Sequence, residues 1–182
     1  MTTDYVQRLE EETASAYDLA EQARAQEKDP EPRVDIPVAE DLAAKSVGLV
    51  TADQFPELED VGVAERIREL EDEYGKNDER VALVIGREIA QDEFYEFGST
   101  ERAVDAGLRI GLSYMTGGIV TAPLEGIADV EIRTNDDGSE YLAVHYSGPI
   151  RSAGGTASAM SVLLADHIRS AVGLDRYKPR DG

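Results

Sequence analysis

The feature that most limits the fold is a run of strict two-residue alternation between residues 127 and 146. It places apolar side chains on one face and charged ones on the other: Ala128, Val130 and Ile132 against Asp129, Glu131 and Arg133. The run 135–138 is turn chemistry that ends in Gly138, a residue free to adopt positive φ. Leu142, Val144 and Tyr146 then resume the apolar face. Residues 127–146 therefore predict a β-hairpin with one buried side.

Helical periodicity dominates the rest of the chain. Helices are expected over residues 4–27, 37–46, 61–74, 79–95, 99–115 and 156–172. Pro37 is a favourable first-turn residue, Gly75 a stop signal and Ser99 an N-cap. Gly86, inside the 79–95 segment, indicates close helix packing. The predicted class is α+β: a mostly helical N-terminal part, then a β-hairpin packed with a C-terminal helix.

Breaks in these patterns suggest three segments. Residues 1–30 form an N-terminal helix, which the prolines at 30 and 32 terminate. Residues 31–60 form a linker with a short helix. Residues 61–182 form an α+β domain. That domain contains the helices of 61–115, the hairpin 127–146, a glycine-rich loop 147–155 and the helix 156–172, and we expect it to continue into downstream sequence.

Charge sets a second constraint, because 38 acidic and 18 basic residues give a formal net charge of −20. Lysine is scarce and the acids are spread through patterned segments, which is typical of a salt-adapted protein. The alternative is an ordinary acidic protein. The chain has no cysteine, no signal-peptide pattern and no apolar run near the ~20 residues of a spanning helix. A soluble cytoplasmic protein is expected.

The acidity is uneven along the chain, since residues 106–182 hold 9 acidic and 7 basic residues. Within them, a glycine-rich loop precedes the last helix. Its backbone N–H groups and side-chain donors are suited to an anion at a helix N-terminus. The candidate anion- or DNA-binding residues are Arg151, Ser152, Gly154, Gly155 and Thr156. Alternatively, the glycines only let hairpin and helix approach closely.

Other polar clusters are read as ordinary surface. The acidic runs 10–12 and 71–73 are typical of solvated helix faces, and Asp136 with Asp137 is explained by a hairpin turn. His145 and His167 are far apart and lack ligand spacing. No Ser-His-Asp or paired-carboxylate arrangement is recognisable. We therefore expect no catalytic residue, metal or cofactor in this segment.

Several longer runs carry a family resemblance. They are residues 33–43 (RVDIPVAEDLA), 118–127 (GIVTAPLEGI), 141–144 (YLAV), 147–156 (SGPIRSAGGT) and 173–179 (GLDRYKP). Together with the opening helix, they resemble the N-terminal region of the large subunit of the archaeal D-family DNA polymerase. The resemblance spans nearly the whole chain, and the salt-adapted composition agrees with a haloarchaeal member of the family.

The resemblance implies a replicative DNA-directed DNA polymerase, a nucleotidyltransferase that works as a heterodimer with a smaller exonuclease subunit. It implies DNA and Mg²⁺ for the full enzyme, and a sliding clamp as a further candidate partner. The family's nucleotidyl-transfer centre carries an Asn-Ala-Asp-Phe-Asp-Gly-Asp motif, which this chain lacks. We therefore expect an inactive N-terminal scaffold. Two alternatives stay open: an autonomous anion- or nucleotide-binding module, and a ligand-free helical interaction protein.

Overall fold

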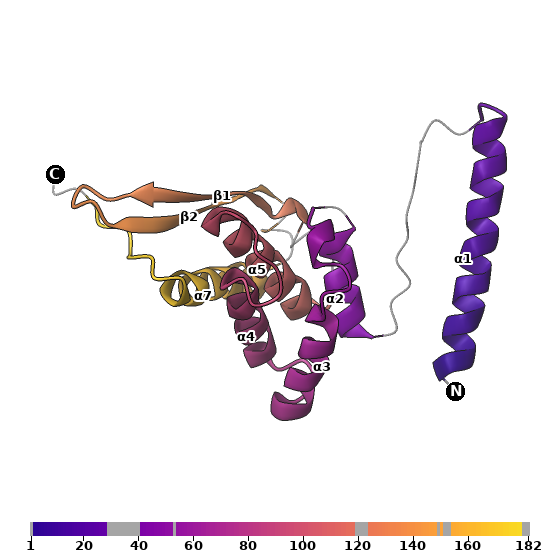
Figure 1. Ribbon diagram of the computed structural model, residues 1–182, viewed down its shortest axis with the longest axis horizontal. Helices are drawn as coiled ribbons and strands as arrows, with labels where there is room; N and C mark the ends of the chain where they lie inside the picture. The colour runs from indigo at the N-terminus through magenta and orange to yellow at the C-terminus, as the bar shows by residue number, and fades with distance from the viewer. Residues whose placement is uncertain are drawn as a thin grey trace. The chain divides into compact units, whose positions relative to one another are not determined.

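The computed structural model describes residues 2–28, 41–52, 54–118, 124–148, 150 and 154–179. The chain divides into two units, residues 1–41 and 42–182. The first unit contains helix α1 (Thr2–Ala25), as the sequence predicts (Figure 1). The side chains of Tyr5, Leu9 and Leu19 on this helix are exposed. The proline-containing break at 30 and 32 lies outside the described residues.

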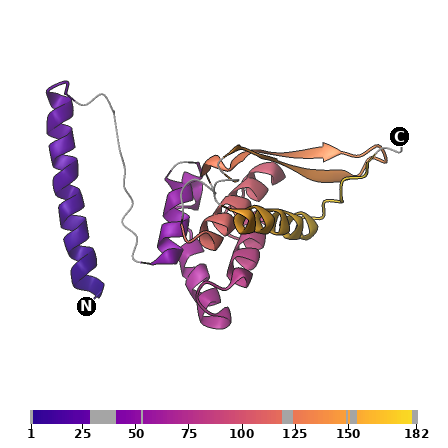
Figure 2. The same ribbon diagram turned by 180° about the vertical axis from the view of Figure 1, so that it is seen from behind.

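The second unit is a helical layer followed by a two-stranded antiparallel hairpin and a last helix (Figure 2). This arrangement confirms the α+β prediction. Its elements are α2 (Leu42–Thr51), η1 (Pro56–Leu58), α3 (Val63–Tyr74), α4 (Glu79–Ala90), α5 (Thr100–Met115), β1 (Ile127–Thr134), β2 (Glu140–Tyr146) and α7 (Gly155–Ala171). No described helix is long and apolar enough to cross a membrane.

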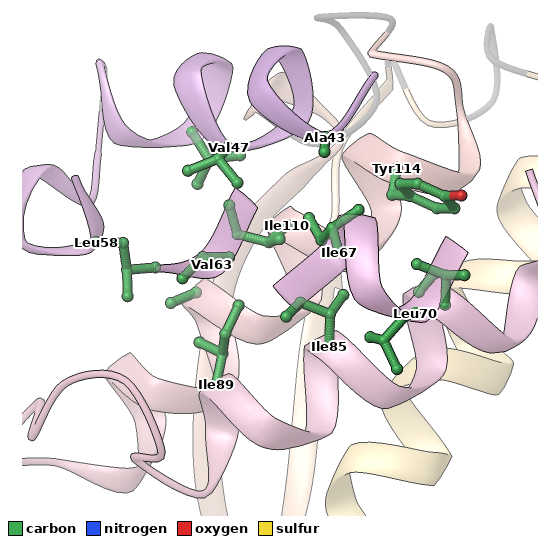
Figure 3. Close-up of a cluster of buried hydrophobic side chains, with 14 of the residues drawn as sticks. Ala43, Val47, Leu58, Val63, Ile67, Leu70, Ile85, Ile89, Ile110 and Tyr114 are labelled. Atoms are coloured by element: carbon green, nitrogen blue, oxygen red, sulfur yellow. The ribbon is translucent and has the colours of Figure 1, made fainter. Parts of the chain in front are cut away.

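The first core lies among α2, α3, α4 and α5 (Figure 3). Ile67, Ile85 and Ile110 are fully buried there. Burying such a side chain contributes roughly 1.5–3 kcal/mol. The helix ends follow local signals: Gly75 caps α3 with φ of +105°, and the Ser99 hydroxyl accepts the Arg102 N–H at the start of α5. Both were predicted from the sequence.

Helices α4 and α5 cross closely and carry the second core on their other side. A Cβ atom on Gly86 would lie 2.9 Å from the Gly107 carbonyl oxygen, so the predicted close packing at Gly86 is confirmed. Beyond this crossing, the hairpin and α7 pack onto α4 and α5. Fully or nearly fully buried side chains form this second cluster, among them Leu108, Leu112, Ile127, Leu164 and Ile168.

Two helix boundaries differ from the sequence prediction. The expected helix 37–46 is α2, which starts at Leu42 and runs to Thr51. Pro37 is therefore not its first-turn residue, and α2 belongs to the packed unit because Val47 and Val50 enter the first core. The expected helix 79–95 ends at Ala90 instead, since Asp92 adopts a left-handed φ of +60° that stops it.

Two side-chain orientations also differ. The ladder is irregular between Ile127 and Asp129, so Ile127 is buried and Ala128 is exposed, contrary to the predicted alternation. This β-bulge shifts the alternation of buried and exposed side chains by one residue. On α7, the 3.6-residue spacing of Leu163 with the other apolar residues of the expected helix 156–172 predicts a place on the core face, yet this side chain is 51% exposed. The buried stripe of α7 consists of Ser161, Leu164, Ala165 and Ile168.

Candidate functional site

The predicted anion-binding loop ends at the N-terminus of α7. Gly154 precedes the helix with φ of +99° and, as a glycine, has no side chain to cap the first turn. Gly154, Gly155 and Thr156 are exposed. Arg151 and Ser152, the other two candidates, lie outside the described residues. The first N–H groups of an α-helix have no acceptor within the helix, and this end is where a helix favours an anion.

Close approach of hairpin and helix does not account for these glycines. A Cβ atom on Gly154 or Gly155 would meet no described atom within 4 Å. What requires glycine at 154 is its positive φ. The Ser158 hydroxyl donates to the Ile150 carbonyl oxygen at 3.1 Å and so links α7 to a residue within the loop. Anion binding at this loop stays a prediction.

The tip of the hairpin is bonded to the segment that follows α7. Buried Asn135 donates from Nδ2 to the Arg176 carbonyl oxygen at 2.9 Å, and its Oδ1 accepts the Lys178 N–H at 2.8 Å. The Asp175 N–H donates to the Glu140 carbonyl oxygen at 2.7 Å. Residues 174–178, which we call the C-terminal segment, therefore run beside the start of β2.

Lysine 178 reinforces this attachment electrostatically. Its Nζ lies 2.6 Å from Asp137 Oδ2 and 2.5 Å from Asp175 Oδ2. Donation from Lys178 holds the pKa of both carboxyl groups below the usual range, and Ser139 adds to the effect at Asp137. The Lys178 ammonium group thus already lies beside the two carboxylates that a metal cation would need as ligands. Within the described ranges, no group of three or more His, Asp or Glu side chains is placed to hold a metal ion.

Arg109, a buried arginine that sequence reasoning missed, holds the backbone at the start of the hairpin against α5. Arg109 on α5 donates from Nε to Asp105 Oδ1 at 2.7 Å, and from its two terminal nitrogens to the carbonyl oxygens of Leu124 and Ile127. Burial raises the pKa of Asp105, although the Arg109 charge opposes that shift. No local pattern marks Arg109, because its backbone partners lie 15 and 18 residues away.

The two histidines lie in separate places. His145 is on the outer face of the hairpin, where its Nε2 is 3.5 Å from Glu131 Oε2 and 3.3 Å from the Arg133 guanidinium. His167 is on α7, and its buried Nε2 has no hydrogen-bond partner among the described residues. The structure does not bring them together.

Comparison with known proteins adds a second line of observation. The family model described as "DNA polymerase II large subunit DP2, N-terminal" matches residues 4–182. The DNA polymerase II large subunit of Thermococcus kodakarensis is 50% identical over 179 residues, which are 97% of this chain and 9% of the relative. That of Methanothermobacter thermautotrophicus is 51% identical over 178 residues, 97% of this chain and 15% of the relative.

The match is continuous but covers a small part of each relative. The DNA polymerase II large subunit of Pyrococcus furiosus is 49% identical over 178 residues, again 97% of this chain, and these make up 13% of that protein. The chain thus spans between 9% and 15% of the length of these relatives. The family expected from the runs at 33–43 and 118–179 is therefore confirmed: the chain belongs to the DNA polymerase II large subunit family, whose N-terminal region it matches.

Proposed function

We propose that this chain is the N-terminal, non-catalytic part of the large subunit of a replicative DNA-directed DNA polymerase. The observation that carries the proposal is the continuous family match over residues 4–182 at 50% identity to a named polymerase subunit. The chain lacks the Asp-rich motif expected of the family's transfer centre. Two-metal phosphoryl transfer with Mg²⁺ is accordingly assigned to other parts of the enzyme.

The role proposed for the segment is that of a scaffold. Two cores share the α4–α5 pair, and the hairpin is attached to α5 by Arg109 and to the C-terminal segment by Asn135. Such cross-links between distant segments suit a part that positions neighbours. The proposed partners are the smaller exonuclease subunit, DNA through the complete subunit, and a sliding clamp. The proposed location is the cytoplasm.

A contact of the α7 N-terminus with an anion extends the proposal. Its support is the exposed, uncapped first turn after Gly154. A DNA phosphate or an acidic side chain of a neighbouring domain would supply the charge. Arg151→Ala should then weaken DNA binding or domain docking in the assembled polymerase without unfolding this segment. Unchanged DNA affinity and unchanged assembly at moderate salt would contradict the contact.

Primer extension tests the function itself. The assembled polymerase that carries this chain should extend a primer with Mg²⁺ and all four nucleotides, whereas the 182-residue chain alone should not. The double substitution Asp136→Ala with Asp137→Ala should not abolish the chemical step of extension by the assembled enzyme, because both residues lie in the hairpin turn, where the Asp137 carboxylate bonds to Ser139 and Lys178. Extension by the chain alone, abolished by that double substitution, would overturn the proposal.

A further inference from the structure

An open groove lies between the hairpin and α7, with a volume of ≈ 270 Å³. One wall is the inner face of β2, with Leu142, Val144 and Tyr146, and the other is α7, with Val162. Tyr177 of the C-terminal segment also lines it. The hairpin and α7 lie side by side in both views of the fold (Figures 1 and 2).

Several of the side chains that line the groove are both apolar and exposed. Val162 is 58% exposed, Tyr177 is 60% exposed and Tyr146 is 38% exposed. In the second unit, the other large hydrophobic side chains with comparable exposure among the described residues are Leu163, next to Val162, and Tyr95. A concentration of apolar side chains around one concave surface marks an interaction site.

The charges around the groove specify what it accepts. Arg169 is neutralised by Asp166, at 2.8 Å, and Lys178 by two carboxylates. Arg176 also lines the groove, and no described carboxylate lies within ion-pair distance of its guanidinium. Among the described residues, the rim therefore offers Arg176 as an uncompensated cation beside an apolar floor, which complements a segment with large apolar side chains and a carboxylate.

Nucleic acid and a second copy fit this surface less well. A groove for single-stranded nucleic acid needs several uncompensated cations along the backbone path, and here Arg169, one of the two described cations that line the groove, is already paired. Self-association would bring together two chains that each carry a net charge of −20.

We propose that the groove between β2 and α7 is the docking site for a protein segment of the same large subunit from outside the region matched here. This inference rests on the proposed function. The relatives supply such polypeptide in quantity, since the matched region makes up 9% to 15% of their length. The segment contributes large apolar side chains to the floor of the groove and a carboxylate to Arg176.

Site-specific photocrosslinking in the assembled polymerase tests this docking. A photoreactive benzophenone amino acid at Val162 should give adducts with peptides of the same polypeptide outside residues 1–182, identified by mass spectrometry. Absence of adducts, or adducts only with the small subunit, DNA, a second copy or residues 1–182, would overturn the proposal. Primer extension by the unmodified assembled polymerase is measured in parallel. It tests the proposed function independently of where the crosslinks form.

Matched substitutions on α7 provide a second measurement. Val162→Asp should weaken binding of the 182-residue chain to the remainder of the large subunit by at least about tenfold, the equivalent of about 1.4 kcal/mol. Leu163→Asp is the control, because Leu163 is 51% exposed on the same helix, close to the 58% of Val162, but does not line the groove. Arg176→Glu should also weaken binding. Equal binding by all three variants and the unmodified chain would contradict the docking.

Discussion

Gly107 lies against Gly86 so closely that a Cβ atom on Gly107 would be 2.3 Å from the Gly86 carbonyl oxygen. The obstacle is backbone, which does not rotate away as a side chain does. Gly107→Ala must therefore separate α4 from α5, the pair that both cores share. We expect a loss of about 1–3 kcal/mol in the free energy of unfolding, measured by thermal or denaturant unfolding followed by circular dichroism.

Gly111→Ala is the matched comparison on the same helix. Its Cβ would meet the Leu164 side chain at 2.8 Å and the Ala82 carbonyl oxygen at 3.0 Å. The Leu164 methyl groups shift more easily than a backbone carbonyl, so the loss should be smaller. Unfolding of Gly107→Ala at the same denaturant concentration as the unmodified chain would contradict the close crossing of α4 and α5.

A second prediction concerns Glu88, a buried carboxylate on α4. Arg66 donates to it from Nε and from a terminal nitrogen, both at 2.9 Å. Arg66→Met leaves this buried carboxylate without its two hydrogen bonds to Arg66 and with only the more distant Arg87 guanidinium, at 3.7 Å. Removing the partner of a fully enclosed pair costs several kcal/mol. Because the Arg66 side chain is 34% exposed, water reduces the loss, and we expect about 1–3 kcal/mol by urea unfolding.

Arg68→Met is the control for that experiment. Arg68 lies on the same helix and pairs with Glu65, whose side chain is 69% exposed. Exposed pairs contribute roughly 0–1 kcal/mol. Equal losses for the two variants would show that burial of Glu88 is not what gives the Arg66 pair its stability.

The attachment of the C-terminal segment should depend on pH only at the extremes. The pKa values of Asp137 and Asp175 are lowered, so their contribution is complete above the ordinary aspartate pKa of about 3.9 and is lost as pH falls below it. The Lys178 pKa is raised, so its contribution is complete below about 10.4 and is lost as pH rises through the folded-state pKa.

Lys178→Met should therefore move the Asp137 carboxyl titration upward, toward the ordinary value. Carbon-detected NMR of the side-chain carboxyl measures the midpoint directly. Lys76→Met removes the same charge from the α3–α4 turn and should leave the midpoint unchanged. An Asp137 midpoint that is the same with and without Lys178 would contradict the ion pair.

Salt should stabilise the fold as a whole. With a formal net charge of −20, self-repulsion opposes the compact state in dilute buffer, and molar KCl reduces the Debye length to about 3 Å. We expect the melting temperature by circular dichroism to rise from dilute buffer to molar KCl, with partial unfolding at the dilute end. A melting temperature independent of KCl would contradict the salt-adapted interpretation.

Sequence patterns predicted the elements whose causes are local. Alternation identified the hairpin, Gly75 and Ser99 marked helix ends, and Gly86 marked the close crossing. The bulge beside Ile127 and the left-handed φ of Asp92 were missed because the spacing of apolar residues does not reveal a single residue that departs from the regular backbone. At the candidate site, the composition of the loop indicated an uncapped helix N-terminus.

The polar contacts between distant segments were not predictable. Arg109 and Asn135 bond to carbonyl oxygens of residues far along the chain, and nothing near them in sequence indicates those partners. The groove between β2 and α7 could not be predicted from the sequence for a related reason. The periodicity of α7 placed Leu163 on the core face, whereas tertiary packing turns it outward next to Val162.

Complementation in trans tests the central claim most directly. A large subunit that lacks the region matched here, assembled with its small subunit, should lose primer extension, because the scaffold that positions its other parts is missing. Adding the 182-residue chain in molar KCl should restore extension, while the chain alone extends nothing. Full extension by the truncated enzyme without the chain, or extension by the chain alone, would contradict the account.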